Sequence, residues 1–321
     1  MKTRIVSILL VALLLPFTSA LAGGVTISVN QFVEHPALDA VLKGFQEDLT
    51  QNGVDATFNI HNAQANMATA NQIGSQIMGE KPDLILAIAT PSSQACAQAM
   101  KKAPHMQNTP LLFSAVTDPV AAGLVSDLKT PGGNITGVSD MLPLAQHMAM
   151  IREFMPGMKR LGVMYNSGET NSRSSVALIK EVAAEMDFEV VEATVSKTSE
   201  VYQAAKSLVG RVDAVFVPTD NTVVESLESV VKVGVENRLP LFCADVDSVQ
   251  RGAAAAMGFD YYKHGEQTGA MARRILAGAK PAETPVEFQE ALSLHVNLPF
   301  AAKMGLTVSE EAKAKADKIY E

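Results

Sequence analysis

Two spacings of apolar residues alternate along the chain from residue 25 onward. The short apolar run 25–29 predicts a β-strand, whereas the apolar residues of 38–49 recur at i, i+3, i+4, i+7 and i+11 and form one stripe of a helix. The unbroken apolar run 84–89 is typical of a strand buried on both faces of a parallel sheet. The first half of the chain therefore predicts strands at 25–29, 56–60, 84–89 and 110–116, and helices that begin at Pro36, Met67 and Ser92.

The same alternation begins again after a glycine-rich stretch at 132–137, which we interpret as a turn. Strands are predicted at 160–165, 189–195, 214–218 and 239–244, and helices at 174–186, 199–208 and 223–237. Strands that alternate with helices of this length indicate right-handed βαβ crossovers and a parallel sheet covered on both sides. Because the pattern restarts after residue 139, we expect two separate sheets rather than one large sheet.

The last part of the chain is less regular and predicts the connections between the two sheets. Segments 253–259 and 292–296 resemble strands, 262–276 a helix, and 309–320 a short charged helix. The predicted fold class is α/β, with two doubly wound parallel-sheet lobes joined by a hinge. We expect the first lobe to contain 23–139 plus 259–285 and the second to contain 140–258 plus 286–321.

The first 22 residues have the features of a signal peptide. Lys2 and Arg4 precede the apolar run 5–17, and residues 19–22 supply a small-x-small pattern, which predicts cleavage before Gly23. The apolar run is shorter than the ~20 residues that a transmembrane helix needs, and no Cys follows it for lipid attachment. We therefore expect a free, exported protein in the periplasm.

Composition narrows the classes of partner. The chain is 47% hydrophobic and 19% charged, has a formal net charge of −8 and contains no Trp. Nucleic acids and anionic membranes attract basic patches, so we expect neither as a partner. The two cysteines, Cys96 and Cys243, lie in apolar segments of different lobes and are predicted to be buried thiols, although an oxidising compartment leaves a disulfide open.

The segments that follow the predicted strands carry polar side chains. Ligands of doubly wound sheets bind at the carboxyl ends of the strands, near the N-termini of helices. In the first lobe these positions hold hydroxyl groups, at Thr90, Ser92, Ser93 and Thr117. In the second lobe they hold carboxylates and amides, at Asn166, Glu169, Asn171, Asp220, Asn221 and Asp245.

This asymmetry predicts a zwitterionic ligand. Hydroxyl groups beside free helix N–H groups suit a carboxylate, and carboxylates suit an ammonium through charge-assisted hydrogen bonds. An amino acid between the lobes would satisfy both. The alternative is that each of these residues only caps a helix, because Ser, Thr, Asp and Asn are the preferred capping residues. Gln31, Phe32 and Glu34 follow the first strand and either line the same cleft or belong to an ordinary loop.

The sequence lacks the common catalytic and cofactor motifs. G-x-G-x-x-G does not follow the first strand, and neither G-x-x-x-x-G-K-[ST] nor G-x-S-x-G occurs. The six histidines include no i, i+4 pair of the kind that binds zinc. We therefore predict no catalytic residue, no metal ligand and no cofactor.

Several stretches carry a family resemblance. They are EHPALD (34–39), ATPSSQA (89–95), FSAVTDP (113–119), GNITGVSD (133–140), YNSGETNS (165–172), PTDN (218–221) and DYY (260–262). With them the chain resembles the substrate-binding proteins of ABC transporters, in the family whose characterised members take up aromatic amino acids of the tryptophan and tyrosine type. The resemblance covers essentially all of the chain after the signal peptide.

The resemblance implies a type I periplasmic-binding fold with a three-stranded hinge, a monomer, and a permease of the inner membrane as partner. It implies that the ligand carboxylate is bound by Ser92, Ser93, Thr117 and the backbone of Ala115. It also implies that Glu169, Asp220 or Asp245 binds the ammonium, assisted by Asn166, Asn171 and Asn221. Phe32 and Tyr261 are the candidates for an aromatic wall.

Three other functions remain open from the sequence. The same fold serves sensory modules that report a ligand to a chemoreceptor or kinase. A transport receptor of this type could also bind a small metabolite other than an amino acid. A periplasmic enzyme on a doubly wound fold is the third alternative, although the sequence offers no nucleophile or metal site for it.

Overall fold

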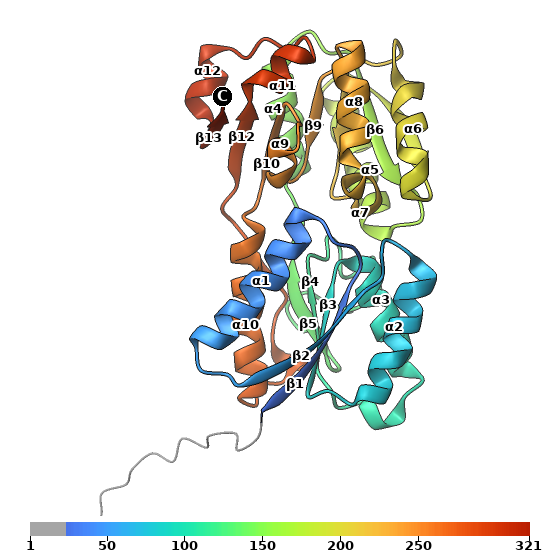
Figure 1. Cartoon of the computed structure of the whole chain (residues 1–321), viewed down its shortest axis with the longest axis vertical. Helices are drawn as coiled ribbons and strands as arrows, with labels where there is room; N and C mark the ends of the chain where they lie inside the picture. The colour runs from blue at the N-terminus through green and yellow to red at the C-terminus, as the bar shows by residue number, and fades with distance from the viewer. Residues whose placement is uncertain (1–23) are drawn as a thin grey trace, which may run out of the picture.

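The computed structural model describes residues 24–321, which form two lobes stacked along the long axis of the molecule (Figure 1). Each lobe is an open, twisted sheet with helices on both faces, which confirms the predicted α/β fold class. The predicted signal peptide, residues 1–22, lies outside the described residues. Within residues 24–321, no helix has both the length and the apolar character needed to cross a membrane.

The first lobe has a parallel sheet of strand order β11-β5-β4-β3-β1-β2. Its strands are β1 (Val25–Gln31), β2 (Ala56–Asn62), β3 (Leu84–Ile88), β4 (Leu111–Ser114), β5 (Ile135–Ser139) and β11 (Glu287–Phe288). Its helices are α1 (Pro36–Gln51), α2 (Met67–Glu80), α3 (Thr90–Lys101) and α10 (Tyr261–Leu276), with 3-10 turns at Pro104–Met106 and Pro281–Glu283.

The second lobe has a sheet of order β13-β12-β10-β9-β8-β6-β7, in which only the β10–β12 pair is antiparallel. Its strands are β6 (Arg160–Asn166), β7 (Glu189–Val195), β8 (Ala214–Val217), β9 (Leu241–Cys243), β10 (Ala255–Gly258), β12 (Ser293–Asn297) and β13 (Lys318–Tyr320). Its helices are α4 (Leu144–Phe154), α5 (Thr170–Glu185), α6 (Val201–Leu208), α7 (Asn221–Glu225), α8 (Leu227–Asn237), α9 (Asp247–Gln250), α11 (Leu298–Lys303) and α12 (Glu310–Lys315), with a 3-10 turn at Thr198–Glu200.

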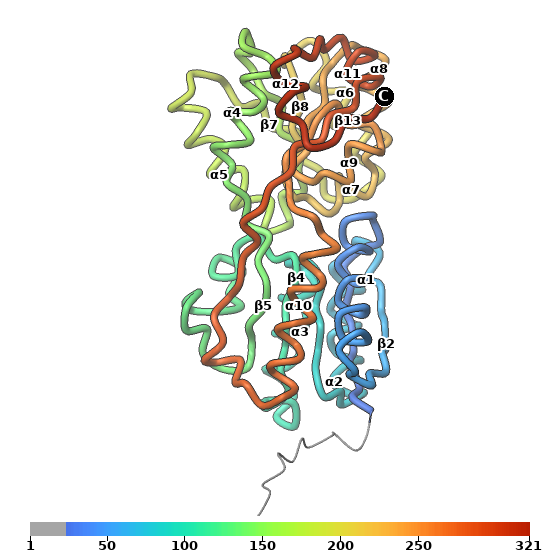
Figure 2. Tube along the Cα trace, turned by 90° about the vertical axis from the view of Figure 1, so that its left-hand side faces the viewer, coloured from blue at the N-terminus to red at the C-terminus, as the bar shows by residue number. Residues whose placement is uncertain are grey.

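The chain crosses between the lobes after β5, after β10 and after β11, and Figure 2 shows these crossings from the side. The last crossing differs slightly from the expected boundary at residue 285. Glu287 and Phe288 pair with Val138 and Ser139 and so extend the first sheet before the chain leaves it.

The glycine-rich stretch at 132–137 is not only a turn, because β5 begins within it. A Cβ atom at Gly137 would lie 2.0 Å from the carbonyl oxygen of Phe113, so the close pairing of β5 with β4 requires glycine there. Glycine inside a strand often marks such a close approach of two backbones. Because glycine is rare in strands, the residue that allows β5 to pair closely with β4 also made β5 hard to recognise from the sequence.

Two predicted helices differ from those in the structure. The helix predicted at 223–237 is divided at Ser226 into α7 and α8. The helix predicted at 309–320 ends at Lys315, and residues 318–320 instead pair with β12 as an edge strand. That strand satisfies backbone groups along β12 that would otherwise lie unpaired at the edge of the sheet.

Each lobe has its own hydrophobic core. Cys96 belongs to the core of the first lobe and Cys243 to that of the second, and both are buried and unpaired. The two thiols lie in separate cores and do not form the disulfide that the sequence left open.

Candidate functional site

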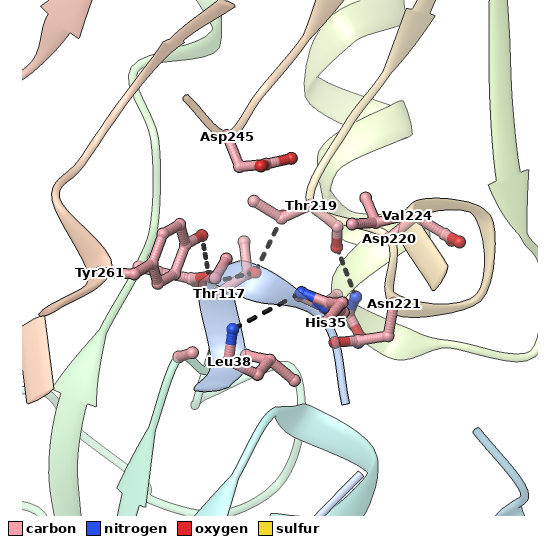
Figure 3. A pocket seen from close by; sticks show the side chains of 13 residues that line it. His35, Leu38, Thr117, Thr219, Asp220, Asn221, Val224, Asp245 and Tyr261 are labelled. Carbon is pink, nitrogen blue, oxygen red and sulfur yellow. Dashed lines mark hydrogen bonds between the residues drawn. The ribbon is translucent and has the colours of Figure 1, made fainter. Parts of the chain in front are cut away.

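A cavity lies between the two lobes, at the carboxyl ends of their parallel strands (Figure 3). This is where doubly wound sheets place their ligands. The first lobe contributes residues from the start of α1, from the segment after β4, from the hinge after β5 and from the start of α10: His35, Ala37, Leu38, Ala115, Thr117, Asp140 and Tyr261. The second lobe contributes Asn171, Thr219, Asp220, Asn221, Val224 and Asp245.

Three carboxylates line this cavity, and all three are buried. Asp140 accepts hydrogen bonds from Thr117 Oγ1 at 2.9 Å and from the Tyr261 hydroxyl at 3.0 Å. Asp245 accepts one bond on each oxygen from Ser248, at 2.8 Å from the backbone N and at 2.6 Å from Oγ. Burial raises the pKa of Asp140 and of Asp245.

Asp220 is the third carboxylate and is 1% exposed. It accepts hydrogen bonds from Asn166 N at 2.5 Å, from Ser172 Oγ at 2.6 Å and from Val223 N at 2.8 Å. Burial, and secondly the negative charge of Glu169, raise the pKa of Asp220 to about 7. Proton uptake relieves the repulsion between two neighbouring buried acids.

The residues that line the cavity include no positive side chain to balance these acids. His35 is the one basic residue among them, and burial, assisted by the positive charge of Arg251, lowers its pKa to about 3. The imidazole is therefore neutral at physiological pH. Since unpaired buried carboxylates are costly, the cavity favours an occupant that carries positive charge.

Asn171 adds an acceptor without a partner. Its Nδ2 donates to the Thr219 carbonyl at 2.8 Å and to Glu169 Oε2 at 3.1 Å, and its Oδ1 is buried with no hydrogen-bond partner among the described residues. A buried acceptor left unpaired in a cavity is a candidate contact for a ligand donor.

The backbone is strained where two strands of the first lobe end beside the cleft. Ala89, after β3, has φ 75° and Ala115, after β4, has φ 55°. Such left-handed conformations are unfavourable for residues with a side chain and cluster at functional sites. The Ala115 N–H donates to His264 Nε2 at 3.0 Å. That amide, which the resemblance assigned to the ligand carboxylate, is therefore already paired.

The structure brings only part of the predicted site together. The predicted residues that line the cavity are Ala115, Thr117, Asn171, Asp220, Asn221, Asp245 and Tyr261. Those that lie outside its lining are Gln31, Phe32, Thr90, Ser92, Ser93, Asn166 and Glu169.

Most of the second group make contacts within one lobe. Gln31 Nε2 donates to Asp39 at 2.7 Å, and Phe32 is packed in the core of the first lobe. Ser92 Oγ donates to Asn30 at 2.9 Å, and Ser93 Oγ donates to the Ala89 carbonyl at 2.9 Å.

Thr90 is buried, and its Oγ1 has no partner among the described residues. In the second lobe Asn166 Nδ2 donates to Thr222 at 2.8 Å, so Asn166 supports the site from behind.

Sequence reasoning missed His35, Ala37, Leu38, Asp140, Thr219 and Val224. Two of them carried a usable signal. His35 precedes the first proline of α1 and caps that helix, with Leu38 N donating to its Nδ1 at 3.5 Å. Asp140 follows β5, so the rule that polar residues follow strands would have found it if β5 had been recognised.

The two lobes touch across the cavity. Thr117 Oγ1 of the first lobe and Thr219 Oγ1 of the second are 3.2 Å apart and share a hydrogen bond (Figure 3). Gln94 Nε2 on α3 donates to Thr170 Oγ1 on α5 at 3.4 Å. His35 of the first lobe and Asn221 of the second lie next to each other in the lining of the cavity (Figure 3). The structure therefore has its lobes in a closed arrangement.

The chain matches the family described as ABC transporter substrate binding protein over residues 26–320. It belongs to this family. Residues 24–321 contain no group of three or more His, Cys, Asp or Glu side chains placed to hold a metal ion. The family assignment makes the protein a solute-binding protein and not a member of an enzyme family.

Two kinds of relative support the same assignment. The chain is 40% identical over 275 residues to a tyrosine-binding protein of Clostridioides difficile, a match that covers 84% of this chain and 78% of that protein. It is 33% identical, with a TM-score of 0.86, to a solved domain from Streptococcus pneumonia in complex with L-Trp, covering 91% of this chain and 99% of that chain.

A third relative bears on the lobe arrangement of this substrate-binding protein. The ligand-free, open structure of a substrate binding protein with adhesive properties from Clostridium difficile is 38% identical and covers 92% of this chain and 99% of that chain, with a TM-score of 0.68. The lower TM-score to the open structure, despite similar identity, agrees with the direct contacts between the lobes.

Proposed function

We propose that this protein is the binding component of an ABC importer and that it takes an aromatic amino acid into the cavity between its lobes. The observation that carries the proposal is the set of buried acceptors around the cavity without a cation to balance them. Asn171 Oδ1 has no partner, and each oxygen of Asp245 accepts a single hydrogen bond. A ligand ammonium would supply both the missing donors and the missing charge.

Other residues around the cavity suit the carboxylate and the side chain of an amino acid. The N-terminus of α1, a helix of 16 residues, reaches the cavity at Ala37 and Leu38, and the positive end of its dipole would favour a carboxylate. Leu38 of the first lobe and Val224 of the second offer apolar surface for a side chain, and the Tyr261 ring offers an aromatic one. The names of the tyrosine-binding and L-Trp-bound relatives support an aromatic ligand.

Export and transport complete the proposal. The signal peptide would place the mature protein in the periplasm, where it acts as a monomer. Closure around the ligand would present both lobes together to a permease of the inner membrane, because a ligand held by both lobes stabilises the closed arrangement.

Isothermal titration calorimetry with L-Trp, L-Tyr and L-Phe tests the ligand, with L-Ala, L-Lys and L-Glu for comparison. Tryptamine lacks the carboxylate and indole-3-propionate lacks the ammonium, so both should bind at least about tenfold more weakly than L-Trp, the value expected for one charge-assisted hydrogen bond. If none of the aromatic amino acids binds while another class of metabolite does, the proposed ligand class is wrong.

Asp245→Asn tests the acceptor wall. This variant keeps the shape of the side chain and removes its charge, so we expect at least about a tenfold loss of affinity for the amino acid with the fold intact. Asp187→Asn is the matched control, because Asp187 is exposed and lies at positive φ, which asparagine tolerates. Equal affinity of the two variants would remove Asp245 from the binding site.

A further inference from the structure

Glu169 is buried behind the cavity and holds the loops that line it. Its Oε2 accepts hydrogen bonds from Asn221 Nδ2 at 2.5 Å, from Asn171 Nδ2 at 3.1 Å and from Asn221 N at 3.3 Å. Its Oε1 accepts from Thr222 Oγ1 at 2.8 Å and from Thr222 N at 3.1 Å. The carboxylate is 2% exposed and is not among the residues that line the cavity.

These contacts separate Glu169 from an ordinary capping residue. It stands at the N-cap position of α5 but makes no capping hydrogen bond to that helix. Its side chain instead joins the start of α5, through Asn171, to the start of α7, through Asn221 and Thr222. The two segments follow β6 and β8, which are neighbouring strands of the second sheet, and both supply residues to the cavity.

The carboxylate also decides how the two amides are turned. Each asparagine donates its Nδ2 to Glu169, so each leaves its Oδ1 as an acceptor. Asn171 has a second anchor, the Thr219 carbonyl at 2.8 Å, whereas Glu169 is the only partner of Asn221 Nδ2 among the described residues. Glu169 is therefore the residue that holds the Nδ2 group of Asn221.

We propose that Glu169 is a positioning residue for ligand selectivity: it presents the amide oxygens of Asn221 and Asn171 to the cavity and thereby makes the site select a ligand with a charged nitrogen. This inference rests on the proposed amino-acid function. It assigns Glu169 no contact with the ligand. The buried negative charge acts through the two amides, which keep an acceptor surface toward the ligand.

Glu169→Gln provides the direct test. A glutamine has one acceptor oxygen and one NH₂ group, so its NH₂ would face donors of Asn221 or Thr222. The Asn221 amide is expected to turn, which directs its Nδ2 toward the cavity and toward His35. We expect the preference for L-Trp over indole-3-propionate, measured as the ratio of their dissociation constants, to fall about tenfold or more. If the turned amide only changed the surroundings of His35, both ligands would bind more weakly by the same factor and the ratio of their dissociation constants would stay the same.

The double variant E169Q/N221D separates positioning from general support of the fold. It exchanges the positions of the carboxylate and the amide and keeps the net charge. The new carboxylate would accept from the glutamine NH₂ and still present an oxygen to the cavity. We expect the preference for L-Trp to return to within about threefold of the wild-type protein, since the acceptor is restored. Asn221→Asp alone should not keep the wild-type preference for L-Trp, because it places a second carboxylate beside that of Glu169.

Glu80→Gln is the matched control. Glu80 is another hydrogen-bonded glutamate, which accepts from Ser28 Oγ at 2.5 Å and from Gln76 at 3.1 Å, but it lies in the first lobe away from the cavity. Its substitution should lower the melting temperature without changing the ligand preference. Circular dichroism and thermal unfolding establish that each variant is folded.

The outcomes distinguish the two proposals. Wild-type protein that binds no aromatic amino acid would contradict the proposed function. Wild-type protein that prefers L-Trp to indole-3-propionate, with an E169Q variant that keeps the same ratio, would overturn only the role of Glu169. If E169Q does not fold, the double variant is compared directly with the wild type, and a folded double variant that has lost the preference overturns the proposal.

Discussion

At the scale of single residues, the chemistry of the site is set by burial. Asp140, Asp220 and Asp245 are ordinary acids in the sequence, and burial raises the pKa of each of them. Burial lowers the pKa of His35 instead, so its imidazole is neutral at physiological pH. The result is a cavity with acceptors on its walls and no positive side chain, which is the basis for expecting a ligand ammonium.

Asp220 makes the affinity depend on pH. Its folded-state pKa, about 7, lies above the value of 3.8 for an unperturbed Asp. The folded protein without ligand therefore holds this proton more tightly than the unfolded chain does. The stability that this group contributes is present below about pH 4 and is lost as pH rises through about 7.

A ligand ammonium favours the ionised form of Asp220. We therefore expect the affinity for the amino acid to increase about tenfold between pH 6 and pH 8, with release of a proton on binding. Titration calorimetry in two buffers of different ionisation enthalpy measures both quantities. In Asp220→Asn the increase should disappear, and an unchanged pH profile in that variant would assign the proton to another group.

At the scale of elements, the return of α10 to the first lobe depends on glycine. A Cβ atom at Gly265 would lie 2.1 Å from the Val41 carbonyl oxygen, and one at Gly44 would lie 2.1 Å from the Tyr262 carbonyl oxygen. α1 and α10 thus pack backbone against backbone. The contact also serves the cavity, because α1 begins beside His35 and α10 begins with Tyr261.

Gly265→Ala should destabilise the protein by about 3 kcal/mol, because the added methyl group forces two backbones apart. Gly79→Ala is the control, since nothing lies within 4 Å of a Cβ at that exposed helical position. It should change stability by less than about 1 kcal/mol and in the favourable direction. Urea unfolding of both variants measures the difference, and equal stabilities would mean that the helix pair adjusts freely.

At the scale of the whole molecule, function depends on the relative position of two lobes that are each complete. Each lobe has its own core, and three connections join them. The lobes meet beside the cavity through the hydrogen bonds of Thr117 with Thr219 and of Gln94 with Thr170. These contacts are few and polar, so a ligand that touches both lobes can determine whether the cleft is closed.

The double substitution T117C/T219C should lock the cleft. The hydroxyl oxygens that the thiols replace are 3.2 Å apart, so the sulfurs can reach bonding distance after a small adjustment. We expect oxidised protein loaded with ligand to release it at least about tenfold more slowly than reduced protein. Each single variant is a control, and the buried Cys96 and Cys243 should not exchange with the new pair. Equal release rates with and without dithiothreitol would show that the ligand can leave without separation of the lobes at residues 117 and 219.

The sequence by itself determined the fold class, because the alternation of apolar strands and striped helices, restarted after residue 139, specifies two covered parallel sheets. It also selected residues that follow recognised strands and that line the cavity between the lobes, namely Thr117, Asn171, Asp220, Asn221 and Asp245. Their position could be predicted because it depends on local spacing and on a general property of parallel sheets.

Only the tertiary structure decided which polar residues face the cavity and which face the protein. Ser92 and Glu169 have the same local pattern as Asp245, yet only Asp245 lines the cavity. His35 and Asp140 enter the site because α1 and the hinge lie opposite the second lobe. The direction of a side chain depends on partners distant in the sequence, and those partners are known only after the two lobes have folded and closed.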